Sequence, residues 1–428
     1  MNEIVELDEK FRRVRMPKGE AQKLYNNKNR ADKVQAISYL RKRTIELIFL
    51  RDYFDYVLAD CAESTGYLKT FRIRRYKHGF VLQFPVKGNI LQLPRNADRQ
   101  EKLYSIHKEA KEWNRILGIK NVSDLNRQIK DGTISNLIKV QEAFHEKKIG
   151  LIADRIKGGF PRKRLILVAG PSASGKTTFL KRLGIQLRAN GLVPEEISLD
   201  NYFMPRSKTP KTSDGDCNFE CLEALDVKYF NKQIKILMEG REVEIPKFSF
   251  KAGIRQGTGE RIKLDTNSVI LVEGIHGLNP KLSCQIERNK KYMIFVSALT
   301  HLWIDNDTRI FTSDSRLMRR IIRDYFFRGY EAVDTLKRFP EVRQGEDKYI
   351  FPFQDNADIF FNSSVIYEQA VMKPFLVRIL KTVKNTGIEF YEASRLLQYL
   401  DFFVSISDKE VPQTSILREF IGHSGFDY

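Results

Sequence analysis

Short apolar runs alternate with amphipathic stretches over most of the second half of the chain. Five such runs stand at 164–170, 196–200, 268–274, 292–299 and 357–363. Apolar runs of this length are typical of strands buried on both faces, as in a parallel sheet. The stretches between them have helical character, and the one at 175–191 ends on a glycine. The pattern predicts an α/β fold, a parallel sheet with helices on both faces.

The first 160 residues have a different pattern. Apolar positions recur at threes and fours over residues 20–60, most regularly over 36–58, which predicts helix there. Residues 70–86 instead alternate apolar and polar side chains about His78-Gly79, as a β-hairpin does.

Two more helical segments are predicted before the apolar runs begin. Ser123 is a candidate N-cap of the first. Ser135 opens the second, which is long and which Gly158, Gly159 and Pro161 bring to an end.

The basic residues are concentrated in this front part. The 428-residue chain has a formal net charge of +19, and residues 1–164 hold 36 basic and 20 acidic side chains. We therefore predict a basic α+β accessory domain over 1–160, and an α/β domain over 161–428 with a helical C-terminal extension at 389–407. A positive surface attracts nucleic acid. We favour the simpler interpretation of a solvated surface and leave RNA binding and homo-oligomerisation open.

The sequence excludes a membrane-spanning or secreted protein and a protein built on a disulfide framework. No apolar run approaches the length of about 20 residues that crosses a bilayer, and the first ten residues are acidic, unlike a signal peptide. The four cysteines are too few and too scattered for a disulfide framework. We expect a cytoplasmic protein without membrane contact.

The stretch from Gly170 to Thr177, GPSASGKT, fits a phosphate-binding loop between a predicted strand and a predicted helix. Backbone N–H groups of such a loop bind phosphates, Lys176 adds a positive charge, and the Thr177 hydroxyl can join a Mg²⁺ shell. The loop predicts a P-loop NTPase-type domain. The predicted nucleotide contacts are Gly170, Ser172, Ala173, Ser174, Gly175, Lys176, Thr177 and Thr178.

Two of the predicted strands end in a carboxylate, Asp200 and Glu273. The carboxyl ends of strands form the ligand-binding edge of an open parallel sheet. Asp200 can accept a hydroxyl proton there, and Glu273 can hold Mg²⁺ beside Thr177.

An arginine-rich stretch at 316–329 has its arginines at spacings of three and four residues, so they share one helix face. They are Arg316, Arg319, Arg320, Arg323 and, at its end, Arg328. Across from a phosphate site such a face can stabilise a phosphoryl group in transfer, although a solvated stripe is an equal alternative.

In this order, GPSASGKTT, SLDNYF, NFECLEALD, VEGIHGL and RLMRRIIRDYFFRG resemble the uridine kinase and phosphoribulokinase family over about residues 164–384. The resemblance implies a kinase that uses ATP and Mg²⁺ to phosphorylate a primary hydroxyl, first of all the 5′-hydroxyl of a nucleoside such as uridine. It implies Asp200 as general base and Lys176, Arg320 and Arg323 as further catalytic residues. Arg316, Arg319 and Arg328 would contact the nucleotide, and Thr177 and Glu273 the metal ion.

The resemblance also implies an acceptor pocket. Glu220 would hold ribose hydroxyls, Tyr202 would lie beside the general base, and Phe248 and Phe250 would bracket the base. The chain departs from the family here, because Glu220 replaces an Asp and Phe248 replaces a Tyr. Losing polar groups that read a base edge leaves the base open.

Two alternatives therefore remain. A sugar or sugar-phosphate kinase of the phosphoribulokinase type would use the cations Lys251 and Arg255 on a phosphorylated acceptor. An RNA-binding regulator would use the phosphate loop as a switch and the basic front part to hold RNA.

A weaker resemblance concerns the front part. Residues 64–85 look like the accessory, editing-type region that a bacterial group of longer kinases shares with threonyl-tRNA synthetases. That region carries a His-x-x-x-His pair, which this chain lacks before the linker. The resemblance implies a remnant without metal or editing chemistry.

Overall fold

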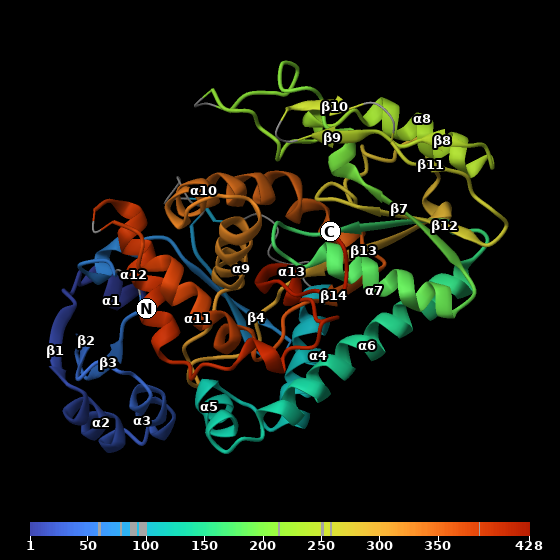
Figure 1. Cartoon of the computed structure of the whole chain (residues 1–428). Helices are drawn as coiled ribbons and strands as arrows, with labels where there is room; N and C mark the ends of the chain where they lie inside the picture. Colours follow the sequence, from blue (N-terminus) through green and yellow to red (C-terminus); the bar gives the residue numbers. More distant parts are fainter. Residues whose placement is uncertain are drawn as a thin grey trace.

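The five predicted strands form one parallel sheet (Figure 1). The computed structural model describes residues 1–58, 61–77, 79–85, 92–93, 101–212, 215–249, 252–256, 259–384 and 386–428. The strands are β6 (Leu165–Ala169), β7 (Val193–Ser198), β12 (Ser268–Glu273), β13 (Lys291–Ser297) and β14 (Ile359–Asn362). Their order is β14-β13-β6-β12-β7, and every neighbouring pair is parallel. The predicted fold class is confirmed.

Each face of this sheet has its own apolar core. On β6, Ile166 and Val168 belong to one core, while Leu165, Leu167 and Ala169 belong to the other. The first core is covered by α6 (Ile134–Gly159), α7 (Lys176–Ala189), α9 (Thr312–Phe327) and α11 (Glu368–Leu380). The second is covered by α8 (Val227–Met238). Continuous apolar runs are needed because successive side chains of a strand point to opposite faces and both faces are buried here.

The predicted helix over 36–58 is wrong after its first residues. Helices α2 (Lys18–Asn27) and α3 (Ala31–Ser38) are followed by strands β2 (Thr44–Leu50) and β3 (Tyr53–Tyr56). They pair with each other, and β2 also pairs with β1 (Arg12–Pro17). Arg51, between β2 and β3, has a φ of 52°, which no helix continues. The β-branched and aromatic residues of this stretch favour strands once β1 supplies a partner.

The predicted hairpin is confirmed as β4 (Arg72–Tyr76) paired with β5 (Gly79–Gln83), although His78 lies outside the described residues. Three helices follow, α4 (Glu101–Leu117), α5 (Val122–Lys130) and α6. The N-cap of α5 is Asn121 rather than Ser123, since the Asn121 side chain accepts hydrogen bonds from Ser123 N and Asp124 N. The long helix begins at Ile134 and ends at Gly159, close to its predicted bounds.

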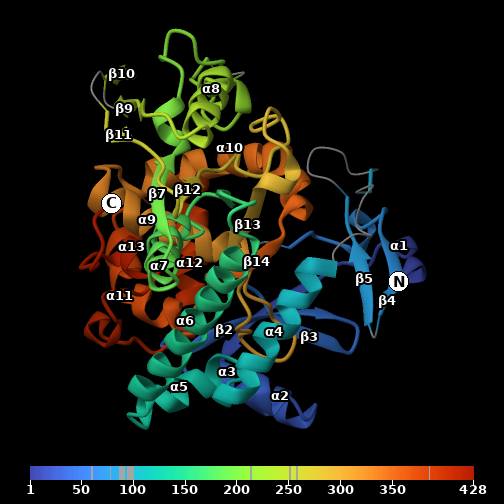
Figure 2. The ribbon, with the colours of Figure 1, turned by 90° about the vertical axis from the view of Figure 1, so that its right-hand side faces the viewer.

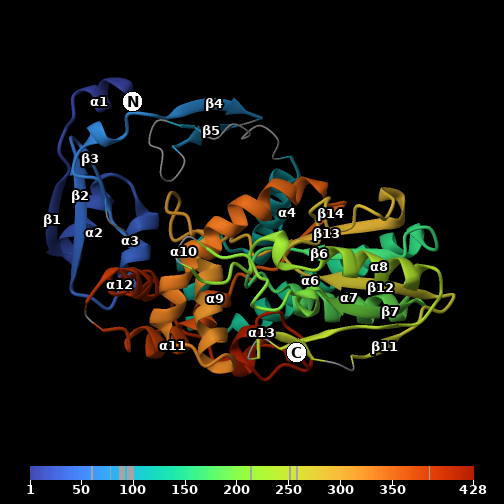
Figure 3. The same cartoon turned by 90° about the horizontal axis from the view of Figure 1, so that it is seen from above.

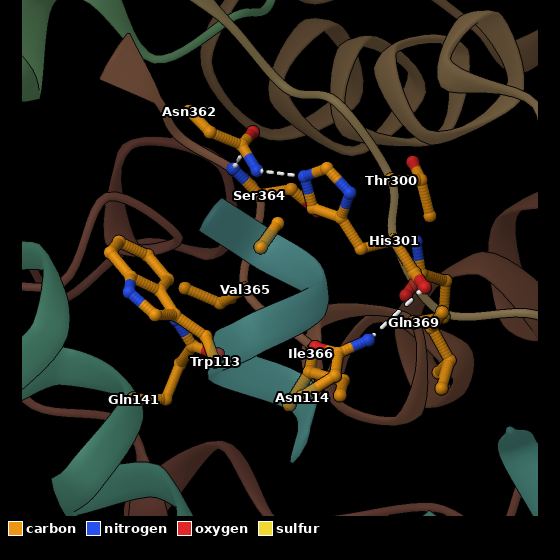
Figure 4. A pocket seen from close by; sticks show the side chains of 12 residues that line it. Trp113, Asn114, Gln141, Thr300, His301, Asn362, Ser364, Val365, Ile366 and Gln369 are labelled. Carbon is orange, nitrogen blue, oxygen red and sulfur yellow. Dashed lines mark hydrogen bonds between the residues drawn. The ribbon is translucent and has the colours of Figure 1, made fainter. Parts of the chain in front are cut away.

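Helices from before residue 160 cover the sheet of the α/β domain (Figure 2). Helix α6 packs along α7, and α4 packs near β14. Figure 4 shows a small pocket where α4 and α6 meet the segments after β13 and β14, with Asn114 donating to the His301 carbonyl at 3.2 Å. Its volume of about 10 Å³ has room for about one water molecule and none for a ligand. The domain boundary at residue 160 stays a prediction.

The rest of the front part, with α1 (Asn2–Glu6) and strands β1 to β5, lies at the far end of the molecule from β7 (Figure 3). It borders α12 (Ile388–Asp401), which accounts for most of the predicted extension at 389–407. Helix α10 (Ala332–Tyr349) and the short α13 (Arg418–Ile421) both pack on α9. Strands β8 (Val243–Glu244), β9 (Lys247–Ser249), β10 (Ile254–Gln256) and β11 (Arg261–Ile262) lie beside α8 (Figure 1). No helix within the described ranges is long and apolar enough to span a bilayer.

A buried ion-pair network joins the front part to the α/β domain. Lys33, on α3, is fully buried and lies 2.9 Å from Asp55 and 3.0 Å from Asp305, where the Tyr56 hydroxyl also donates to Asp305. Removing one member of such a network leaves the other charge buried and unpaired.

We expect Lys33→Met to lower the free energy of unfolding by about 3 kcal/mol, because Asp305 keeps its charge without its cation. Denaturant titration checks this, with the double variant Lys33→Met/Asp305→Asn as control. The double variant should recover part of the loss, and a single-variant loss below about 1 kcal/mol would contradict the network's role.

Candidate active site

The phosphate loop lies between β6 and α7, as predicted. Gly175, the N-cap of α7, has a φ of 80°, and a Cβ there would lie 2.4 Å from Cγ2 of Ile416. Glycine is thus required at this position for both conformation and space. At Gly170 a Cβ would lie 1.9 Å from the Val296 carbonyl oxygen. The first turn of α7 directs its free N–H groups toward the loop, which is how helices bind anions.

Lys176 is the cation shared by the carboxylates of the site. Its Nζ donates to the Pro171 carbonyl at 3.1 Å. Burial raises the pKa values of Asp200, Glu220 and Glu273, and the positive charge of Lys176 opposes that increase in all three. One lysine among three carboxylates leaves a net negative charge, which the nearby arginines described below offset.

Glu273, the last residue of β12, lies beside the loop hydroxyl. Thr177 Oγ1 donates to Glu273 Oε2 at 3.2 Å. Burial raises the pKa of Glu273 to about 7 against the effect of Lys176, and Asp200 and Glu419 raise it further. A carboxylate and a hydroxyl so placed suit a hard cation such as Mg²⁺. No cluster of three or more His, Cys, Asp or Glu side chains suited to a metal exists in the part of the chain that the structure describes. Phosphate oxygens and water would therefore complete the coordination of Mg²⁺.

Asp200 follows β7 in the 3-10 turn Leu199–Tyr202, at the carboxyl edge of the sheet. Its side chain is open to solvent, yet enough protein surrounds it that desolvation raises its pKa. Lys176, Arg328 and Arg323 act in the opposite direction. The residue thus combines access, a raised pKa and three nearby cations, which suit a general base in a phosphate site.

Glu220 packs against Gly345 of α10, and the charge of Arg320 on α9 reaches it. Burial raises its pKa to about 7, partly offset by Arg320. A Cβ on Gly345 of α10 would lie 2.6 Å from the Glu220 Cβ, so a glycine here makes room for the carboxylate. The position of Glu220 is thus fixed by a helix that sequence reasoning did not connect with it.

The arginines of α9 fall into two groups. Arg320, Arg323 and Arg328 gather around Asp324, with Arg323 Nη2 2.8 Å and Arg320 Nε 3.2 Å from its carboxylate. Arg320 also donates to the Ser172 hydroxyl of the loop at 2.9 Å. Three guanidinium groups share a single carboxylate here, so this cluster keeps an excess of positive charge beside the loop.

Arg316 and Arg319, predicted to contact the nucleotide, are instead fully buried. Arg316 pairs with Glu346, donating through Nη2 at 2.7 Å, and also donates to the Ser172 carbonyl at 3.1 Å. Arg319 pairs with Glu368, donating through Nε at 3.1 Å. The physical reason is that both side chains point into the core between α9, α10 and α11, where a carboxylate has to balance each buried charge.

Both buried pairs support the phosphate loop. Glu346 accepts from the Ser172 N–H at 3.2 Å. Arg319 donates to the Ser363 carbonyl at 2.9 Å, and the Ser363 hydroxyl donates to the Ser174 carbonyl. The two buried pairs therefore hold the backbone of the loop at Ser172 and Ser174.

The predicted acceptor residues are only partly gathered. Tyr202 is fully buried and donates to Gln233 Oε1 at 2.6 Å. Arg255 is engaged by Asp226 at 3.2 Å and by the carbonyl groups of Tyr202 and Phe203. Both side chains are thus occupied within the protein. Phe248 is buried beside Phe203, with ring centroids 5.8 Å apart.

Phe250 and Lys251 lie outside the described residues. Sequence reasoning also missed four carboxylates of the site, namely Asp324, Glu346, Glu368 and Glu419. Only Asp324 left a signal, because it lies four residues after Arg320 on the same helix face.

The α/β part of the chain is similar to known proteins. The model of the phosphoribulokinase / uridine kinase family matches residues 165–368. Uridine-cytidine kinase B of Dictyostelium discoideum is 30% identical over 196 residues, covering 46% of this chain and 72% of that protein. The chain belongs to the phosphoribulokinase/uridine kinase family. It is thus an ATP-dependent kinase of the nucleoside or sugar type.

Other relatives and solved structures match this chain at lower identity. A uridine kinase of Borrelia hermsii is 27% identical over 232 residues, covering 53% of this chain and 99% of that protein. Among solved structures, a possible uridine kinase from Bacillus stearothermophilus matches with 16% identity and a TM-score of 0.33, covering 47% of this chain and 89% of that one. A D-glycerate 3-kinase from Cryptococcus neoformans matches with 13% identity and a TM-score of 0.26, covering 64% and 86%. The family match does not extend to residues 1–164.

The buried ion pair between Arg316 and Glu346 supports the phosphate loop, so ATP binding should depend on it. We expect Glu346→Gln to weaken ATP binding by about tenfold or more. Arg316 becomes a buried charge without a counter-charge, and one oxygen is left to accept from both Arg316 and the Ser172 N–H. Calorimetric titration with ATP measures the change. Arg343→Gln is the control, since Arg343 contacts Glu346 at 3.4 Å from a partly exposed position. Equal affinities in the wild type and Glu346→Gln would contradict the supporting role.

The raised pKa of Glu220 predicts a pH dependence of stability. Its folded-state value of about 7 exceeds its ordinary value of 4.5, so the stability it contributes is full below pH 4.5 and is lost as pH rises through 7. Gln cannot ionise, so Glu220→Gln should melt higher than the wild type at pH 8, by about 2 °C or more, and the difference should shrink toward pH 5. Melting curves from pH 5 to 8 test this, with the exposed Glu223→Gln as control. A difference that does not vary with pH would contradict the assignment.

Proposed function

We propose that the protein transfers the γ-phosphate of ATP to the 5′-hydroxyl of a nucleoside, with uridine the first candidate. The observation that carries the proposal is the position of Asp200, at the sheet edge beside Lys176 and across from the arginine cluster around Asp324. The uridine kinases among the relatives support a nucleoside as the acceptor.

In the proposed reaction Asp200 accepts the proton of the acceptor hydroxyl. The oxygen forms a bond to the γ-phosphorus, the bond from that phosphorus to the bridging β,γ-oxygen breaks, and ADP leaves with the electron pair. Lys176, Arg320, Arg323 and Arg328 stabilise the negative charge on the phosphoryl oxygens. Mg²⁺, held by Thr177 and Glu273, would neutralise charge on the β- and γ-phosphates when it is bound.

Glu220 supports an acceptor that carries hydroxyl groups. A carboxylate accepts two hydrogen bonds from a vicinal diol, and Glu220 lies within the field of Lys176, Asp200 and Arg320. The sugar-phosphate alternative loses one of its reasons, because Arg255 is held by Asp226 and two backbone carbonyls. We therefore infer a neutral acceptor with a ribose-like diol, whose base is the least constrained part.

We expect Asp200→Asn to lower phosphoryl transfer by a factor of about 10² or more with ATP affinity nearly kept, because the general base is lost and the loop is not. Single-turnover transfer and ATP titration measure the two effects, and Glu223→Gln is the matched surface control. Unchanged transfer in Asp200→Asn would remove this residue from the mechanism.

A panel of acceptors tests the substrate class. ADP release with uridine, cytidine, adenosine, ribose and ribulose 5-phosphate should be fastest with a pyrimidine nucleoside. Faster turnover of the sugar phosphate would contradict the nucleoside proposal.

A further inference from the structure

The C-terminal segment of the chain packs onto the phosphate loop. Residues 411–428 include α13, and Ile416, Leu417 and Phe420 within it are fully buried. The Ile416 side chain fills the space where a Cβ on Gly175 would lie. The segment is thus anchored directly against the N-terminus of α7 (Figure 1).

One carboxylate of this segment occupies donors of the phosphate site. Glu419 Oε2 accepts from Thr178 N at 3.1 Å and from Thr178 Oγ1 at 2.8 Å. The hydroxyl of Tyr428 lies 2.8 Å from the same Thr178 Oγ1. Thr178 is the third residue of α7, so its N–H has no acceptor within the helix and is one of the groups that an anion at this terminus binds.

The contact is favourable without nucleotide and unfavourable with it. A carboxylate at a helix N-terminus is stabilised by the helix dipole. The charge of Glu419 also reaches Glu273, whose pKa it raises. A polyphosphate brings several negative charges to the same few ångströms, and phosphate oxygens need the N–H groups of the loop and of this first turn. The carboxylate and the nucleotide therefore compete for one place.

We propose that residues 411–428 form an autoinhibitory strap, in which Glu419 stands in for a phosphate and must leave Thr178 before nucleotide binds fully. The proposal rests on the proposed function, because it assumes that the loop binds ATP. The buried Ile416, Leu417 and Phe420 keep the strap attached. In the proposal, nucleotide displaces the Glu419 side chain and the residues beyond Gly422. Tyr428 is 60% exposed, and few contacts hold the tail. Its hydroxyl contacts Thr178 and Ser424, and the Gly425 N–H donates to the Gln413 carbonyl at 3.0 Å.

Glu419→Gln tests the strap, because it keeps the shape of the side chain and removes its charge. We expect its dissociation constant for ATP, and for ADP, to fall about tenfold relative to the wild type in calorimetric titrations without acceptor, within the usual range of couplings between sites. The difference should shrink at high ionic strength, which screens the repulsion. Glu410→Gln is the matched control, since Glu410 is an exposed carboxylate of the preceding turn. It should bind nucleotide as the wild type does.

A second measurement uses the unaltered chain. Amide hydrogen exchange over residues 423–428 should become faster when saturating ATP and Mg²⁺ are added, whereas exchange of the loop should become slower. Equal or weaker binding by Glu419→Gln, or slower exchange of the tail with ATP, would overturn the strap and leave the kinase proposal intact. Absence of nucleotide binding by the wild type would instead contradict the proposed function, and the strap with it.

Discussion

The ion pair between Arg316 and Glu346 is the interaction on which the site depends. It is fully buried, it joins α9 to α10, and both partners contact Ser172 of the phosphate loop. Arg319 and Glu368 repeat the arrangement one turn further along α9, reaching the loop through Ser363. Buried pairs contribute little net stability, but they allow few alternative arrangements once formed. The loop is therefore held by side chains that are themselves fully buried.

This arrangement divides one arginine-rich helix into two functions. The buried arginines consume their charge on Glu346 and Glu368, whereas Arg320, Arg323 and Arg328 share Asp324 and keep an excess of positive charge. The charges of this cluster reach Asp200 and Glu220, where they offset the increase in pKa that burial causes. Several carboxylates lie close together in this site before any ligand binds, which lowers the stability of the fold. Such a loss of stability is common where a site is preorganised for catalysis.

The sequence predictions that were correct rest on patterns among neighbouring residues. The features that were missed depend on contacts between residues far apart in the sequence. The five sheet strands and the loop could be predicted because apolar runs and glycine spacing are properties of a few neighbouring residues. Residues 44–56 could not, since their strands depend on pairing with β1, which helical periodicity does not report. Spacing placed four arginines on one face of α9. It could not tell which of them meet Glu346 and Glu368, 30 and 49 residues away.

Because sequence patterns do not report contacts between distant residues, they also gave no sign that residues 411–428 pack on the phosphate loop. Residues 411–428 contain no nucleotide-binding motif, yet Ile416 and Glu419 meet the two features that define the loop, the left-handed Gly175 and the first turn of α7. Glycine at 175 leaves room for an apolar side chain, and the free N–H of Thr178 attracts a carboxylate. The properties that make the loop a phosphate site thus also make it a docking site for the chain's own C-terminal segment. ATP binding at this site must therefore break the contact between Glu419 and Thr178 at every turnover. If the contact persists, the Glu419 carboxylate stays close enough to weaken the binding of ATP.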